Sequence, residues 1–188
     1  MSLQKNRPPI EEIENEADYA ECLTRCIDSC SYFVEQFLGL NNVFDYNKVF
    51  LDCDERFIVY RTGRQVGKSR NAALKAIHFG YFAPVKARNI DEGECNIVIA
   101  SISKDQAFLI FRKISNFIHK SNLIKIIHET KTDMTIEWFD GSGRTNFVVR
   151  PIGDTGEGLR GFTVHMAILD EAAYIPETVF DAFFPSTV

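Results

Sequence analysis

The chain has 188 residues, of which 45% are hydrophobic, 12% aromatic and 25% charged. This composition is that of a globular protein, and the length suits one domain with a sizeable core. The net charge of −5 excludes a protein that holds nucleic acid by bulk positive charge, so any contact with DNA must be local. The sequence has no apolar run long enough for a membrane span and no apolar secretory core at its amino terminus, which argues against export.

The five cysteines indicate a reducing, intracellular compartment. Their number is odd and no CxxC pair occurs, so the sequence predicts neither a disulfide framework nor a zinc ribbon. Three of them, Cys22, Cys26 and Cys30, recur every four residues, a spacing that could place three thiolates on one helix face. No fourth ligand is evident, so we expect these three to pack as small core residues.

The first half of the chain is predicted to contain an arm, two helices and a strand. Residues 1–16 are polar, acidic and proline-containing, as in a flexible arm. Apolar residues recur at helical spacing over residues 17–38, which predicts one amphipathic helix ended by Gly39. The apolar run 57–60 is typical of a strand, and it leads through a turn into a helix that ends near Phe82.

The second half alternates strands with a helix. A strand at 95–100 precedes a helix with apolar residues between 107 and 118. Residues 134–139 and 145–149 are predicted to form a β-hairpin, because the residues between them suit a turn. A strand of the buried type follows at 164–169. Together these elements predict an α/β fold with a mostly parallel sheet that helices cover on both faces.

The turn after the first strand is a candidate phosphate-binding loop. It ends in Gly-Lys-Ser between a strand and a helix, where backbone amides and the helix dipole favour a phosphate. Lys68 can reach the β- and γ-phosphates of a nucleotide, and the Ser69 hydroxyl can coordinate Mg²⁺. Thr62 stands where the usual pattern has its first glycine, so a lone Gly-Lys-Ser in a surface turn is the alternative. The expected nucleotide-binding residues are Gly63, Arg64, Gln65, Val66, Gly67, Lys68 and Ser69.

Two carboxylates follow the last predicted strand, in the pattern of a Walker B segment. The carboxyl ends of parallel strands share one crevice, so Asp170 is predicted to meet the phosphates near Ser69 and to hold Mg²⁺. Glu171 is predicted to orient and help deprotonate the water that attacks the γ-phosphate. The alternative is a strand that ends at the surface with two solvated acids.

These segments resemble the large subunits of the terminases of tailed bacteriophages and related viruses, over about residues 57–185. In that family an Arg-Gln pair precedes Gly-Lys-Ser or Gly-Lys-Thr, and the first glycine can be lost. An Arg-Gly turn precedes the Walker B strand, and small residues, an aromatic residue and Ile-Pro follow it. The matching residues here are Arg64, Gln65, Gly67, Lys68, Ser69, Arg160, Gly161, Asp170, Glu171, Ala172, Ala173, Tyr174, Ile175 and Pro176.

The resemblance implies a P-loop NTPase of the branch with a catalytic glutamate (ASCE-type), with an added β-hairpin and an amino-terminal helix. It implies hydrolysis of ATP with Mg²⁺ to drive double-stranded DNA into a capsid, with Glu171, Lys68 and Arg64 as catalytic residues. Arg64 would act as an arginine finger in cis, or else only support the bound nucleotide electrostatically. Tyr46 and Asn47 lie where family members often read adenine with a glutamine.

The family further implies a portal protein and a small terminase subunit as partners, a homo-oligomeric ring on the capsid, no membrane and a place in the host cytoplasm. We expect an arm at 1–16 and an ATPase domain at 17–188, without the family's coupling motif and nuclease domain, and therefore a weakly active amino-terminal fragment. One alternative is a helicase-like (superfamily 2) DNA translocase. It would share the lysine and the Asp-Glu pair but more often carries Gly-Ser/Thr-Gly-Lys. The other is a nucleotide-binding interaction module that is not a motor.

Overall fold

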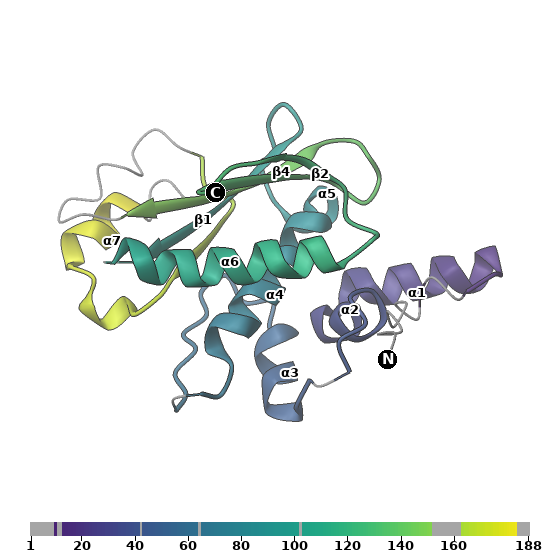
Figure 1. The fold of residues 1–188 in the computed structure, drawn as a ribbon, viewed down its shortest axis with the longest axis horizontal. Helices are drawn as coiled ribbons and strands as arrows, with labels where there is room; N and C mark the ends of the chain where they lie inside the picture. The colour runs from purple at the N-terminus through teal and green to yellow at the C-terminus, as the bar shows by residue number, and fades with distance from the viewer. Residues whose placement is uncertain are drawn as a thin grey trace, which may run out of the picture. The chain divides into compact units, whose positions relative to one another are not determined.

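The computed structural model describes residue 10 and residues 13–41, 43–63, 65–101, 103–151 and 163–183. The chain forms two compact units, Met1–His78 and Phe79–Val188. The boundary falls within a helix, α4, that contributes residues to both units. In Figure 1 the first unit runs from purple to teal-blue and the second from teal to yellow.

The first unit is helical throughout its described elements. Its helices are α1 (Glu16–Asp28), α2 (Cys30–Gln36), α3 (Asp45–Leu51) and most of α4 (Lys68–Tyr81). The helix predicted after the Gly-Lys-Ser loop is therefore confirmed as α4. The core of the first unit contains Phe33 and Phe37, which stack with ring centroids 4.9 Å apart.

The prediction of one helix over residues 17–38 is wrong, because Ser29 divides it into α1 and α2. Ser29 has extended backbone (φ −127, ψ 115), and its hydroxyl caps α2 by accepting a hydrogen bond from the Tyr32 amide at 3.1 Å. The Asp52 carboxylate accepts hydrogen bonds from the Ser31 amide at 2.8 Å and from the Ser31 hydroxyl at 2.6 Å. A carboxylate from a distant part of the chain thus stabilises the start of α2 and favours the break.

The cysteines of α1 and α2 are core residues, as predicted. Cys22, Cys26 and Cys30 are all buried, and all five cysteines of the chain are free thiols. Burial raises the pKa of Cys26 to about 12, so its thiol is neutral at physiological pH. The Cys26 carbonyl lies 2.8 Å from Nε2 of the buried His78, which ties α1 to α4.

The second unit is built on a five-stranded sheet in the order β2-β3-β4-β1-β5. Its strands are β1 (Glu94–Ser101), β2 (Ile126–Glu129), β3 (Asp133–Glu137), β4 (Arg144–Pro151) and β5 (Met166–Leu169). β1 pairs in parallel with β4 and with β5, whereas β2, β3 and β4 are antiparallel. The α/β class and the predicted hairpin, now β3 and β4, are confirmed, and β2 is an additional strand that the sequence did not predict.

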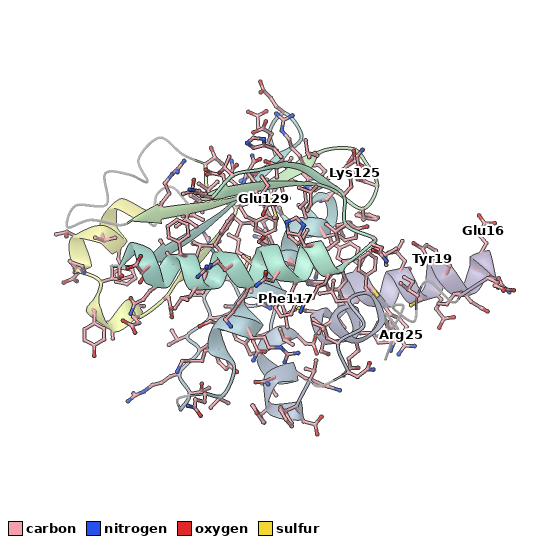
Figure 2. All side chains as sticks on the ribbon, in the orientation of Figure 1. Glu16, Tyr19, Arg25, Phe117, Lys125 and Glu129 are labelled. Atoms are coloured by element: carbon pink, nitrogen blue, oxygen red, sulfur yellow. The ribbon has the colours of Figure 1, made fainter. Side chains whose placement is uncertain are left out.

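Helices accompany this sheet in the second unit: α5 (Ala83–Lys86), α6 (Lys104–Lys120), the 3-10 helix η3 (Ala172–Tyr174) and α7 (Glu177–Phe183). Figure 1 shows α6 running along the sheet, where it packs against β1 and β4. Two of its side chains also contact Glu129 at the β2 edge, labelled in Figure 2. The Ser115 hydroxyl donates to this carboxylate at 2.9 Å, and Nε2 of His119 lies 2.7 Å from it.

Two strand predictions need correction. Residues 57–60 form no strand within the described part of the chain, and Phe57 and Val59 are 64% and 93% exposed. Apolar, β-prone residues make a strand only when a neighbouring strand pairs with their backbone, and no described segment does so. The strand predicted at 164–169 is present as β5 (Met166–Leu169), but its residues are half-buried, since among the described strands it lies at the edge of the sheet, next to β1.

Candidate nucleotide-binding site

The candidate phosphate-binding loop leads directly into α4, which begins at Lys68. The local pattern explains this, because the loop glycines suit a turn and the residues after it are mostly helix formers. Arg64 lies outside the described residues. The structure places the other predicted loop residues as follows: Gly63 and Gln65 are exposed, and Val66, Gly67, Lys68 and Ser69 are half-buried.

The backbone of the loop contains two residues in the left-handed region. Gln65 has φ 64 and Gly67 has φ 90. Glycine adopts such a value without strain, so Gly67 allows the chain to reverse before the helix. The Gly67 carbonyl then accepts the Asn71 amide at 2.9 Å, in the first turn of α4. The amides at this helix start have the geometry that favours an anion.

Lys68 folds back over the start of the loop. Its ammonium donates hydrogen bonds to the Thr62 carbonyl at 3.0 Å and to the Gly63 carbonyl at 3.1 Å. The positive charge therefore lies inside the loop, close to the first turn of α4. A lysine in this position can exchange carbonyl partners for phosphate oxygens, since its ammonium carries three donors on a flexible stem.

Two buried side chains and the half-buried Tyr60 form a hydrogen-bonded network beside the loop that the sequence analysis missed. Asn71 donates through Nδ2 to Oδ1 of Asn47 at 2.7 Å and to the Tyr60 hydroxyl at 3.2 Å. The Tyr60 hydroxyl in turn donates to Oδ1 of Asn47 at 3.0 Å. The sequence offered one signal for this network: a polar residue, Asn71, among the apolar positions of the α4 pattern.

Tyr46 and Asn47 lie where family members often read the adenine base, and of these two only Tyr46 is accessible. Tyr46 is 52% exposed and stacks on Phe44, with ring centroids 5.4 Å apart and an interplanar angle of 6°. Asn47 is 2% exposed, and its Oδ1 already accepts two hydrogen bonds. Asn47 therefore serves the interior of the first unit, where its side chain is not accessible to a base.

The acidic pair lies at the carboxyl end of β5, in the second unit. The Asp170 amide donates to the Ala100 carbonyl at 3.0 Å, so pairing with β1 continues to this residue. The Asp170 carboxylate accepts the Glu171 amide at 3.2 Å. Glu171 is exposed and has left-handed backbone (φ 54, ψ 39). Such backbone is uncommon for a residue with a side chain and is concentrated at functional sites.

The neighbouring strand also ends in a polar residue. Ser101 closes β1 and is fully buried, and its hydroxyl donates to Oε1 of Gln106 at 3.0 Å. Because Ala100 pairs with Leu169, Ser101 and Asp170 both extend from the carboxyl ends of parallel neighbours. Polar residues at this edge fit the general position of ligand sites in open α/β sheets.

The structure tests the predicted metal ligands only in part. Ser69 belongs to the first unit and Asp170 to the second, so their meeting at one Mg²⁺ stays a prediction. Among the residues that the structure describes, no three His, Cys, Asp or Glu side chains are grouped to hold a metal ion. A hydroxyl, one carboxylate, water and phosphate oxygens are nevertheless a usual Mg²⁺ donor set, so the predicted residues fit this cation. Within the same residues, none of the helices has the length and apolarity to cross a membrane.

A comparison with solved structures finds a protein with a similar fold. The fold is similar to that of the large terminase ATPase domain from Thermus phage P74-26, with a TM-score of 0.63 and 22% sequence identity. The similarity covers 85% of this chain and 64% of that chain, so this chain spans less than two thirds of the related domain. This chain therefore shares the fold of that domain.

The family follows from a second comparison. Residues 59–180 match the family model of the terminase large subunit, T4likevirus-type, N-terminal, and the chain belongs to this family. The matched range contains both the Gly-Lys-Ser loop and the acidic pair. No curated protein matches the sequence.

Proposed function

We propose that this chain is the ATPase motor domain of a terminase large subunit, which hydrolyses ATP to drive double-stranded DNA into a viral capsid. The Gly-Lys-Ser loop at the start of α4, within the range that matches the terminase family, carries this proposal. The acidic pair after β5 supports it.

In the proposed binding step, the loop amides and the start of α4 surround the phosphates of ATP. Lys68 leaves the carbonyls of Thr62 and Gly63 and contacts the β- and γ-phosphates instead. Ser69 and Asp170 would hold Mg²⁺, which when bound neutralises phosphate charge. The residues that we propose for nucleotide binding are Gly63, Arg64, Gln65, Val66, Gly67, Lys68 and Ser69.

In the proposed chemical step, Glu171 orients a water molecule toward the γ-phosphate and takes up its proton. Arg64 and Lys68 stabilise the negative charge that develops on the phosphate oxygens. The left-handed backbone of Glu171 supports this role, because it sets the exposed carboxylate just beyond the strand end.

The proposed partners are double-stranded DNA, a portal protein, a small terminase subunit and further copies of the chain in a ring, in the host cytoplasm. With a net charge of −5, the proposed contact with DNA is local and does not depend on bulk positive charge.

Two variants test the assignment. Lys68→Ala should abolish ATP binding, because it removes the only lysine of the loop. Glu171→Gln should keep the affinity and lower hydrolysis by about a hundredfold or more, the usual effect of losing a general base. Calorimetric titration with MgATP and measurement of phosphate release separate the two effects. Lys113→Ala, which removes an exposed lysine of α6, is the matched control and should change neither quantity.

Equal ATP affinity in wild type and Lys68→Ala would refute the proposed site. Tight ATP binding by the wild type, with no hydrolysis for Glu171→Gln to reduce, would instead identify a nucleotide-binding interaction module.

A further inference from the structure

The two ends of the phosphate-binding loop are tied to one buried residue. Tyr60 immediately precedes the loop and Asn71 follows it, in the first turn of α4. Oδ1 of Asn47 on α3 accepts hydrogen bonds from the Tyr60 hydroxyl at 3.0 Å and from the side-chain Nδ2 of Asn71 at 2.7 Å. Nδ2 of Asn71 also donates to the Tyr60 hydroxyl at 3.2 Å, which closes the network. Asn47, Tyr60 and Asn71 are referred to below as the amide clamp.

The two asparagines of the clamp are buried. Asn71 is 0% and Asn47 is 2% exposed, so water does not compete for their hydrogen bonds. In such surroundings a hydrogen bond is electrostatically stronger, and removing one partner leaves the other unsatisfied. The clamp therefore constrains the chain on both sides of the loop more firmly than a surface contact would.

Within the described part of the chain, one buried oxygen of the clamp lacks a hydrogen bond, which lowers stability, so stability alone does not explain an asparagine at this position. Oδ1 of Asn71 is buried and has no hydrogen-bond partner among the described residues. A Cβ placed on Gly67 would lie 4.0 Å from both Oδ1 and Nδ2 of Asn71, so this side chain flanks the loop itself. An apolar residue at position 71 would avoid the unpaired oxygen but could not tie Tyr60 to Asn47.

The helix that carries Asn47 is itself held to α4. One turn further along both helices, the Lys75 ammonium donates to the Leu51 carbonyl at 2.8 Å and to the Cys53 carbonyl at 2.6 Å. The ring of Phe50, also on α3, stacks on Tyr60 with centroids 4.0 Å apart. α3 and α4, neighbours in Figure 1, are therefore joined both by the clamp and by Lys75.

We propose that Asn47, Tyr60 and Asn71 are positioning residues that hold the two ends of the phosphate-binding loop in place before nucleotide binds. The inference rests on the proposed binding of ATP by this loop. With its ends fixed, the loop has less conformational freedom to lose when it closes on phosphates, and binding is tighter as a result. The clamp residues act on the loop and do not contact the nucleotide.

Alanine variants and a double-mutant cycle test the proposal in the full 188-residue chain. Asn47→Ala and Asn71→Ala should each weaken MgATP binding about tenfold, within the usual range for losing a buried hydrogen bond. The double variant should bind about as weakly as either single variant, because both changes open the same clamp. Tyr60→Phe keeps the ring stack and removes one hydroxyl, so it is the variant least able to disturb folding. It should weaken binding by about two- to threefold.

Lys75→Ala is the matched control, because it loosens α3 from α4 away from the loop. It should lower the urea midpoint of unfolding and change the Kd for MgATP by less than about twofold. Wild-type affinity in folded Asn71→Ala and Tyr60→Phe would overturn the proposal. Equal loss of affinity in Lys75→Ala would do so as well, since it would indicate general destabilisation.

A second measurement does not depend on nucleotide. Hydrogen exchange of amides between residues 61 and 69 should accelerate at least about tenfold in Asn71→Ala and stay near wild type in Lys75→Ala. Unchanged exchange in Asn71→Ala would refute the clamp even if ATP binds. Accelerated exchange in a chain that fails to bind ATP would support the clamp and refute the proposed function instead.

Discussion

At the scale of single residues, four residues with side chains have left-handed backbone in the described part of the chain, and two of them lie in the candidate sites. Gln65 and Glu171 have φ of 64 and 54, values that a residue with a side chain adopts at a cost of about 1–2 kcal/mol. One lies in the phosphate-binding loop and the other in the acidic pair. Strain of this kind persists where function requires a particular direction of the chain.

His165, just before β5, is expected to make the stability of the chain depend on pH. Its Nδ1 accepts a hydrogen bond from the Asn96 amide at 3.0 Å, so the neutral ring carries its proton on Nε2, and a second proton could bind only at Nδ1, in place of this hydrogen bond. Burial lowers the pKa of His165 below its usual value of 6.5. The folded state then binds fewer protons than the unfolded state, so the free energy of unfolding should fall as the pH drops below about 6.5.

Urea unfolding of wild type and His165→Asn at pH 7.5 and 5.5 measures this effect. The variant should lose part of the decrease in unfolding free energy that the wild type shows between the two pH values. His128→Asn, a change at an exposed histidine, should keep the wild-type decrease. An identical decrease in wild type and His165→Asn would contradict the assignment.

At the scale of elements, the end of α4 depends on the absence of a side chain. A Cβ on Gly80 would lie 2.8 Å from Cγ2 of Thr145, 3.0 Å from the Phe147 ring and 3.1 Å from Cδ1 of Ile97. The Gly80 carbonyl also accepts the Thr145 hydroxyl at 2.7 Å. Alanine is the better helix former, yet here it would push the helix end away from β1 and β4.

Gly80→Ala should therefore lower the free energy of unfolding by about 2–3 kcal/mol. Gly141→Ala is the control, since a Cβ there meets nothing within 4 Å and only the positive φ of 72 opposes it. That change should cost about 1 kcal/mol. Chemical denaturation compares the two variants, and equal losses would argue against close packing at Gly80.

At the scale of the whole molecule, the proposed site requires residues of both units to act on one nucleotide. The phosphate-binding loop belongs to Met1–His78 and the acidic pair to Phe79–Val188. A ligand that binds only the folded chain stabilises it by about 2.7 kcal/mol at a hundred times its Kd. For a chain of this length that corresponds to a rise in Tm of about 5–10 °C.

MgATP should accordingly raise the Tm of wild type by that amount and leave the Tm of Lys68→Ala unchanged. Asp170→Asn should show a smaller rise than wild type, because its proposed contact reaches the nucleotide through Mg²⁺. Differential scanning fluorimetry gives all three values. A full rise in Asp170→Asn would indicate that the acidic pair does not share the nucleotide with the loop.

The sequence alone determined the features whose signals lie among adjacent residues. The turn chemistry of residues 63–69 predicted the loop and the start of α4, and the apolar runs predicted β1, the β3–β4 hairpin and α6. The motifs around Lys68 and Asp170 were sufficient to indicate the terminase family, which the family match confirms. Backbone propensity and side-chain periodicity act over a few residues, so these features could be read directly.

Only the tertiary structure decided the features that need distant partners. Asp52 divides the first helix at Ser29, and Asn47 ties Tyr60 to Asn71 across the loop. The apolar run at 57–60, for its part, has no strand to pair with in the described part of the chain. Hydrogen bonds between residues far apart in the chain leave no periodic signal in the sequence, because they depend on where folding brings the partners.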